Sequence, residues 1–148
     1  MEVLYNHIGK NYDVTRQADL EIVNCLKRHL QVEEGLVLDV ACGTGNYTVA
    51  LKNAGLDMVG VDVSDEMIRQ AQEKMKEINW NIADVKKLPF SSRTFKGATC
   101  ILAIHHFDHL VEAFQEVYRV IDEGRFVIFT SSPEQMDRYW LKEYFPVA

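Results

Sequence analysis

Apolar and polar residues alternate along the chain with two different periods, and the period switches repeatedly between the two ends. A spacing of three or four residues between apolar side chains is typical of an amphipathic helix, whereas a short continuous apolar run is typical of a buried strand. The helical period predicts helices over 16–30, 46–54, 64–76 and 108–121, and another over 133–144. The apolar runs predict strands over 36–39, 57–63, 78–83, 95–103 and 125–130.

This alternation of strands and helices is typical of right-handed β-α-β units and a parallel sheet. We therefore expect a Rossmann-like, doubly wound α/β fold with a mostly parallel sheet of about five strands and helices on both faces. The stretch 88–93 reads as a loop. A single domain should span 1–148, with an N-terminal helical segment (1–31), a ligand-binding core (32–131) and a C-terminal helix (132–148).

Composition and charge narrow the classes of protein that the chain can belong to. Its 148 residues are 47% hydrophobic, enough for a core without disulfides, and its net charge is -6. No apolar run is long enough to span a membrane, and the first residues lack the pattern of a signal peptide, so we expect a cytoplasmic protein without a membrane span. The acidic balance and the lack of a Lys/Arg cluster argue against a nucleic-acid partner.

Cysteine and histidine usage does not favour a metal site. Cys25, Cys42 and Cys100 are odd in number and widely spaced, which predicts reduced thiols. The run 105–109 contains three histidines and an aspartate, but neighbouring residues of an extended segment point in opposite directions. Asp108 is also placed to cap the helix that follows. We therefore expect no metal.

The candidate chemistry lies just after the predicted strands, where doubly wound sheets bind ligands. Gly43 and Gly45 follow the first strand and allow a tight turn and a close approach to a ligand. Asp62 follows the second strand, where it can accept both hydroxyl protons of a ribose. Asp84 follows the third and can accept from an exocyclic amine.

Two further residues separate the possible nucleotide ligands. A dinucleotide fingerprint requires a third glycine where this chain has Thr48, which argues against a nicotinamide-dependent oxidoreductase. The carboxylate of Asp39 would repel a pyrophosphate but suits a ligand with an ammonium group. Adenine, ribose and a cationic amino-acid tail together describe S-adenosylmethionine.

The motifs resemble those of the class I S-adenosylmethionine-dependent methyltransferases, in particular the small-molecule "type 11" group typified by ubiquinone/menaquinone biosynthesis enzymes. The resemblance covers Tyr12 to about Thr130. The motifs occur in the family's order, at 36–45, 60–64 followed by Met67, 83–84, 88–90, 95–107 and 124–128.

The resemblance implies a role for each matching residue. Asp39 would hold the methionine ammonium, Asp62 the ribose hydroxyls and Asp84 the adenine amine. The other implied cofactor contacts are Ala41, Gly43 and Gly45 along the methionine and ribose, Val63 and Met67 on adenine, Leu102 and Ala103 through backbone, and Tyr12 and Arg16 at the methionine end. His105 and His106 are the candidate general bases.

The implied activity is in-line transfer of a methyl group to a small-molecule acceptor, with S-adenosylhomocysteine as product. An alternative is a module that binds the cofactor without turnover. The family's fold usually continues past the fifth strand into a helix and an antiparallel hairpin, whereas only 18 residues follow Thr130 here. We therefore expect an open edge on the fifth strand, and the chain to be a fragment, a naturally minimal enzyme or a homodimer that covers this edge.

Overall fold

The computed structural model describes residues 18–104, 107–130 and 140–144. These residues form four helices and six strands, and a helix precedes each of the first five strands except β4, which follows β3 directly. The helices are α2 (Leu20–Leu30), α3 (Asn46–Asn53), α4 (Asp65–Lys74) and α5 (Leu110–Val120). The strands are β1 (Leu36–Val40), β2 (Asp57–Asp62), β3 (Asn79–Ile82), β4 (Phe95–Ile101), β5 (Ile121–Thr130) and β6 (Trp140–Tyr144).

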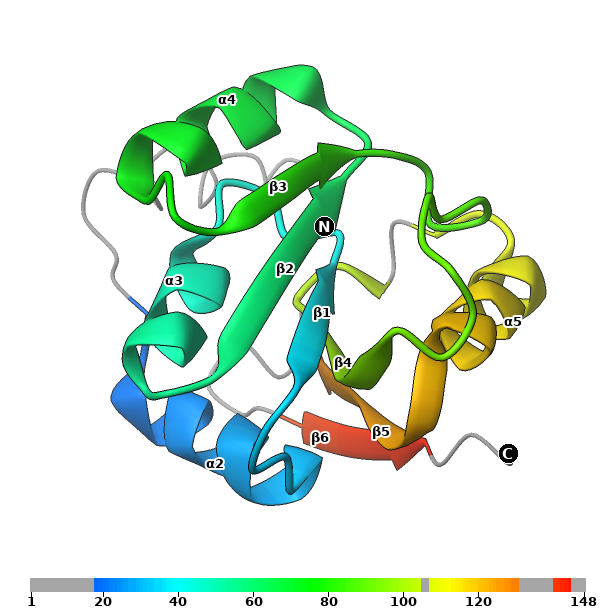
Figure 1. Ribbon diagram of the computed structural model, residues 1–148, viewed down its shortest axis with the longest axis horizontal. Coiled ribbons are helices and arrows are strands. Elements are labelled where there is room, and N and C mark those ends of the chain that lie inside the picture. Colours follow the sequence, from blue (N-terminus) through cyan, green and yellow to red (C-terminus); the bar gives the residue numbers. More distant parts are fainter. Residues whose placement is uncertain (1–17, 105–106, 131–139, 145–148) are drawn as a thin grey trace.

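The strands form one sheet in the order β3-β2-β1-β4-β5-β6 (Figure 1). Strands β1 to β5 pair in parallel, and β6 pairs antiparallel with β5. The chain first adds strands on one side of β1 and then, through the crossover to β4, on the other side. The predicted doubly wound fold is confirmed, and the order of strands reverses between β1 and β4, where such sheets bind ligands.

Helices cover both faces of the sheet, as expected (Figure 1). Helices α2, α3 and α4 pack over one face through a cluster that includes Leu26, Leu51 and Ile68. Helix α5 packs over the other through Val117 and Val120, together with the connection between β3 and β4. This connection contains no helix over residues 83–94, in agreement with the predicted loop.

The helix boundaries follow local capping chemistry. Ser64 caps α4 as the prediction requires, since its hydroxyl accepts from the Met67 N–H at 3.2 Å. Helix α2 begins later than predicted, because Asp19 caps it by accepting from the Glu21 N–H at 2.8 Å.

The start of α5 corrects one expectation. Asp108 does not cap this helix, whose N-cap is His109 with no side-chain hydrogen bond. The Asp108 carboxylate lies instead 3.6 Å from the Lys86 ammonium, on the connection from β3. Strand β5 likewise begins at Ile121 and not at 125, because Phe95 pairs with Ile121 before a shift in register brings Gly97 opposite Arg125.

The C-terminal segment corrects a second expectation. The predicted helix over 133–144 is wrong at Trp140–Tyr144, which form β6 beside β5 from Thr130 opposite Trp140 to Phe126 opposite Tyr144. An available strand edge and a segment rich in aromatic residues favour this pairing over a helix. Over Phe126–Thr130 the edge of β5 is therefore covered, which removes the reason for a homodimer at this edge. The rest of the predicted C-terminal helix lies outside the described residues.

Candidate functional site

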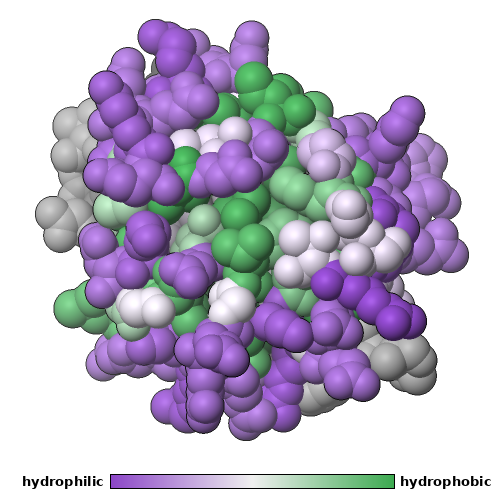
Figure 2. Space-filling view, viewed as in Figure 1, coloured by the Kyte–Doolittle hydropathy of each residue, from purple (hydrophilic) through white to green (hydrophobic). Residues whose placement is uncertain are grey.

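A cleft of about 460 Å³ opens beyond the carboxyl ends of β1, β2, β3 and β4. Its volume lies in the range of small-molecule and cofactor sites. Seen from the direction of Figure 1, hydrophobic residues are exposed in the middle of the face with hydrophilic residues around them (Figure 2). The cleft is lined by Ala41 and Gly43, by 61–64 and Met67, by 83–86, and by Ala103 and 107–109.

The loop after β1 supplies one wall of the cleft. Its backbone turns through left-handed conformations at Ala41 (φ 55), Gly43 (φ 59) and Gly45 (φ 85). The Cys42 N–H donates to the Val61 carbonyl at 2.9 Å, which ties the loop to β2. A Cβ on Gly43 would meet nothing within 4 Å, so this glycine leaves open space at the cleft wall.

Gly45 has a packing role in addition to the cofactor contact predicted for it. It does not line the cleft, and a Cβ at this position would lie 2.5 Å from the Trp80 ring. The ring also lies against Gly60, and its N–H donates to the Met75 carbonyl at 2.7 Å. Gly45 is therefore needed for the packing of the loop on Trp80.

Asp62 joins the loop after β1 to the start of α4. Its Oδ2 accepts from the Gly43 N–H and its Oδ1 from the Ser64 N–H, both at 2.9 Å. The carboxylate is thereby held in a fixed orientation at the cleft wall. Each oxygen retains a further lone pair that a ligand hydroxyl can use.

Asp84 lies on the connection after β3. The preceding N–H, of Ala83, donates to the Asp62 carbonyl at 3.0 Å, so the two acidic positions are adjacent. Asp84 Oδ1 accepts from the Lys86 N–H at 2.9 Å, and Oδ2 lies 3.9 Å from the Lys86 ammonium. The Asp84 side chain is half exposed and so accessible to a ligand.

Asp39 is buried under the loop and does not line the cleft. Its carboxylate accepts from the Thr48 hydroxyl at 2.6 Å and from the Thr99 hydroxyl at 3.0 Å. Burial raises the pKa of Asp39 from 3.8 to about 6, although the two hydroxyls act in the opposite direction. Thr48, in the position of a third glycine, thus fits between helix and sheet through this hydrogen bond.

The structure brings together most of the described residues that the sequence singled out. Seven of the predicted cofactor residues line the cleft: Ala41, Gly43, Asp62, Val63, Met67, Asp84 and Ala103. Asp39, Gly45 and Leu102 do not, and the Leu102 N–H donates to the Phe129 carbonyl at 2.7 Å. Tyr12, Arg16, His105 and His106 lie outside the described residues.

Sequence reasoning missed several residues of the cleft, among them Lys86, Phe107 and His109. A signal existed for Lys86, which lies two residues after Asp84, but no pattern indicated that the connections after β3 and β4 meet. The packing role of Trp80 was also missed, although Gly45 before α3 and Gly60 in β2 leave room for a large ring to lie against them.

The cysteines and acidic side chains of the described residues are candidate nucleophiles and metal ligands. Burial raises the pKa of the Cys42 thiol well above its usual value, which fits a structural residue and not a nucleophile. Within the described ranges, no group of three or more His, Cys, Asp or Glu side chains is arranged to hold a metal ion.

No helix in the described part of the chain has the length and apolarity to cross a membrane.

Comparison with known proteins identifies the family. A family model described as a methyltransferase domain matches residues 37–124, which contain the sheet from β1 to the start of β5 and all the lining residues of the cleft. The chain belongs to this family. The resemblance noted from the motifs is therefore confirmed, and the fold of this methyltransferase domain agrees with it.

Individual relatives of the chain are also methyltransferases. The chain is 32% identical to a demethylmenaquinone methyltransferase of Protochlamydia amoebophila, over 84% of its own length and 58% of the relative's. It is 28% identical to a malonyl-[acyl-carrier protein] O-methyltransferase of Pseudescherichia vulneris, over 86% of its own length and 51% of the relative's. The chain thus spans little more than half the length of these curated relatives.

Among solved structures, the PH0226 protein from Pyrococcus horikoshii has 30% sequence identity and a TM-score of 0.78. That likeness covers 89% of this chain and 63% of the other. The YcgJ protein of Bacillus subtilis has 27% identity and a TM-score of 0.69, over 76% of this chain and 51% of the other.

Proposed function

We propose that this methyltransferase domain binds S-adenosylmethionine in the cleft, transfers a methyl group to a small-molecule acceptor and releases S-adenosylhomocysteine. The observation that carries the proposal is the meeting of Gly43, Asp62 and Asp84 at one cleft of a methyltransferase fold. The open space at Gly43, the fixed carboxylate of Asp62 and the exposed carboxylate of Asp84 suit the polar groups of an adenosine.

The residues that line the cleft fit S-adenosylmethionine. The open space at Gly43 allows the backbone to approach a ribose, and Asp62 offers lone pairs on both oxygens to the ribose hydroxyls. Val63 and Met67 are 69% and 42% exposed, and such apolar side chains suit the faces of an adenine ring. We assign the adenine amine to Asp84.

Only some of the residues predicted at the methionine end of the ligand line the cleft. Ala41 and Ala103 line the cleft and are proposed to contact it. The role of Asp39 toward the ammonium stays a prediction, as do the contacts of Gly45 and Leu102 and those of Tyr12 and Arg16.

When bound, S-adenosylmethionine supplies an electrophilic methyl group on a sulfonium. The task of the protein is then to hold the acceptor atom in line with that methyl group and to exclude water. A base is required only if the acceptor atom carries a proton that must leave. His105 and His106 remain the predicted candidates for that step.

The names of the two relatives suggest acceptors of two kinds, a demethylmenaquinone and a malonyl group on a carrier protein. We propose a small molecule or a small acyl group as acceptor, with no nucleic-acid partner and a cytoplasmic location. The acceptor atom is left for an acceptor screen that measures formation of S-adenosylhomocysteine.

A thermal-shift titration tests the cofactor. Saturation with S-adenosylhomocysteine at about 100 times its dissociation constant should stabilise the chain by about 2.7 kcal/mol, whereas NAD should have no effect. Stabilisation by NAD alone would contradict the proposal and favour an oxidoreductase. Stabilisation by S-adenosylhomocysteine without turnover of any acceptor would favour a binding module.

A further inference from the structure

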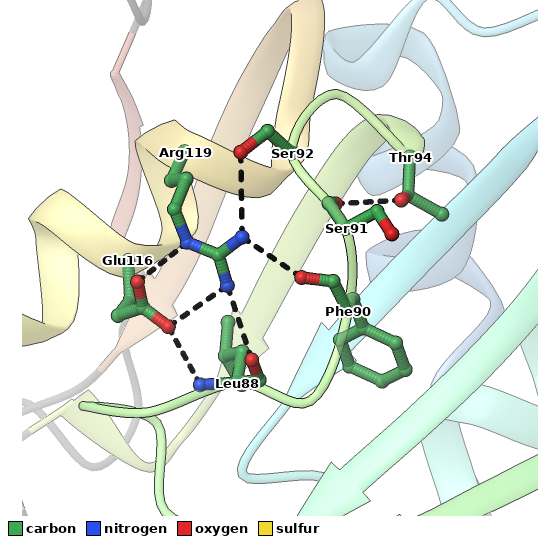
Figure 3. A network of polar contacts seen from close by, with 7 residues as sticks. All are labelled: Leu88, Phe90, Ser91, Ser92, Thr94, Glu116 and Arg119. Atoms are coloured by element: carbon green, nitrogen blue, oxygen red, sulfur yellow. Dashed lines mark hydrogen bonds and ion pairs between the residues drawn. The ribbon is translucent and has the colours of Figure 1, made fainter.

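The connection between β3 and β4 has to be held in place without a helix of its own. Residues 83–94 form neither a helix nor a strand, so their backbone N–H and carbonyl groups lack the hydrogen bonds of such elements. Where these groups are buried, they require other hydrogen-bond partners. Two side chains of α5, Glu116 and Arg119, supply these partners (Figure 3). Figure 3 shows both side chains pointing from α5 toward the connection.

Arg119 binds the connection through its guanidinium. Its Nη2 donates to the Leu88 carbonyl at 3.0 Å, and its Nη1 donates to the Phe90 carbonyl at 2.8 Å and the Ser92 hydroxyl at 3.4 Å. The Arg119 backbone carbonyl accepts from the Arg93 N–H at 2.9 Å. One residue of α5 therefore contacts the connection at four of its residues.

Glu116 completes the arrangement. Its Oε2 accepts from the Leu88 N–H at 2.6 Å, and its carboxylate accepts from Arg119 at 2.7 Å and 3.1 Å. Hydrogen bonds from Arg119 lower the pKa of Glu116, so the ion pair is maintained at neutral pH. Both backbone groups of Leu88 are thus fixed by one half-buried pair.

Leu88 is separated from the cleft by a single tight turn. The Lys87 N–H donates to the Asp84 carbonyl at 2.9 Å, and the Lys86 N–H donates to the Asp84 carboxylate at the same distance. On the other side of the turn, Ala83 is bonded to β2. Asp84 is therefore held between a strand and a residue that α5 fixes.

We propose that the Glu116–Arg119 pair positions Asp84, so that α5 sets the selectivity of the cleft for a purine 6-amino group. The inference rests on the proposed function, because Asp84 is the residue assigned to that amine. Glu116 and Arg119 do not line the cleft, and they act through the turn at 84–88. Lysine can replace Arg119 only in part, because a single ammonium lacks the planar fork that reaches Glu116, Leu88 and Phe90 together.

The test compares the affinities of two ligands, S-adenosylhomocysteine and its analogue with hydrogen in place of the 6-amino group. The chain should bind S-adenosylhomocysteine about tenfold more tightly or better, since the analogue leaves the Asp84 carboxylate without its donor. In Arg119→Met this ratio should fall to within about threefold of the ratio measured for Asp84→Ala. Arg119→Lys should give an intermediate value.

A second pair of ligands gives the readout that a merely structural role would not produce. The preference for S-adenosylhomocysteine over its 2′-deoxy analogue depends on the ribose and should be the same in Arg119→Met and in the unchanged chain. Arg69→Met is the matched control, because Arg69 also pairs with a glutamate three residues earlier but lies on the exposed surface of α4. It should preserve both ratios.

Each outcome decides a different claim. If Arg119→Met weakens all ligands alike and keeps the amine ratio, the pair is merely structural and the inference is overturned. If the unchanged chain binds S-adenosylhomocysteine without preferring the amine, the inference fails while the proposed cofactor stands. If it does not bind S-adenosylhomocysteine, both fail. Should Arg119→Met not fold, Glu116→Gln, which has the same shape as the native side chain, is measured under the same criteria.

Discussion

The three carboxylates at the ends of β1, β2 and β3 have three different surroundings. Asp62 and Asp84 reach the cleft, as the sequence predicts, whereas Asp39 is buried against two threonine hydroxyls. The burial of Asp39 could not be predicted from the spacing of the carboxylates along the sequence, because one of its two partners, Thr99, is 60 residues away. Thr48 stood out in the sequence only as a departure from a glycine pattern.

The role of Asp62 can be tested by a single substitution. Asp62→Ala should weaken binding of S-adenosylhomocysteine by about 1.5–3 kcal/mol, because it removes charge-assisted hydrogen bonds to the ribose. Isothermal titration calorimetry measures the change. Asp57→Ala is the control, since this exposed aspartate lies at the opposite end of the same strand and should leave the affinity unchanged. An affinity unaffected by Asp62→Ala would refute the ribose assignment.

The raised pKa of Asp39 should make the free energy of unfolding depend on pH. Its pKa of about 6 in the folded state lies above its usual 3.8, so the folded protein binds this proton more tightly than the unfolded chain does. The associated stability is present below about pH 4 and is lost as the pH rises through 6. A pKa difference of this size corresponds to about 3 kcal/mol.

Comparison with Asp39→Asn isolates this contribution. Urea unfolding between pH 4 and 7 should show the native chain losing stability relative to the variant as the pH rises, with no further change above pH 7. The amide does not titrate, so all other groups cancel in the difference. A difference between the two proteins that stays constant over this range would contradict the prediction.

At the scale of elements, Trp80 links three neighbouring segments. Its ring lies against Gly45 at the start of α3 and Gly60 in β2, and its N–H is bonded to the end of α4. The position of the loop after β1 therefore depends on the packing of Trp80, a residue of β3. Glycine at these positions is required by the ring and not only by a ligand.

Gly60→Ala tests this packing. The added methyl group would lie 2.5 Å from the Trp80 ring and 3.1 Å from the Cys42 sulfur, and overpacking of this kind destabilises a protein by about 1–3 kcal/mol. In a Trp80→Leu background the same substitution should cost less than half as much. Denaturant unfolding of the four proteins gives the coupling energy. Equal costs in the two backgrounds would mean that the ring is not the obstacle.

The elements themselves were predictable where one local rule decides them. Ser64 caps α4, and the apolar run at 36–38 forms a buried strand, because short-range chemistry and burial agree there. The prediction was wrong for Trp140–Tyr144, where pairing with a distant strand outweighs the helical pattern. The cap at Asp108 was wrong for a similar reason, since an ion pair with Lys86 across the cleft attracts that side chain.

At the scale of the whole molecule, the parallel sheet and the family were both predictable. Alternating strands and helices leave few allowed topologies, and right-handed crossovers favour a parallel sheet with helices on both faces. The cleft could be placed at the carboxyl ends of the strands by the same rule. Its full lining could not, because it depends on how the connections after β3 and β4 meet, which Lys86 and Asp108 now show.

The placement of the two tryptophans has a spectroscopic consequence. The Trp80 indole lies beside the loop after β1, near one edge of the sheet. The other tryptophan, Trp140, belongs to β6 at the opposite edge. Intrinsic fluorescence can therefore observe the two ends of the molecule separately once either tryptophan is replaced by phenylalanine. Emission from Trp80 would then follow the packing of its ring against Gly45 and Gly60 without a label.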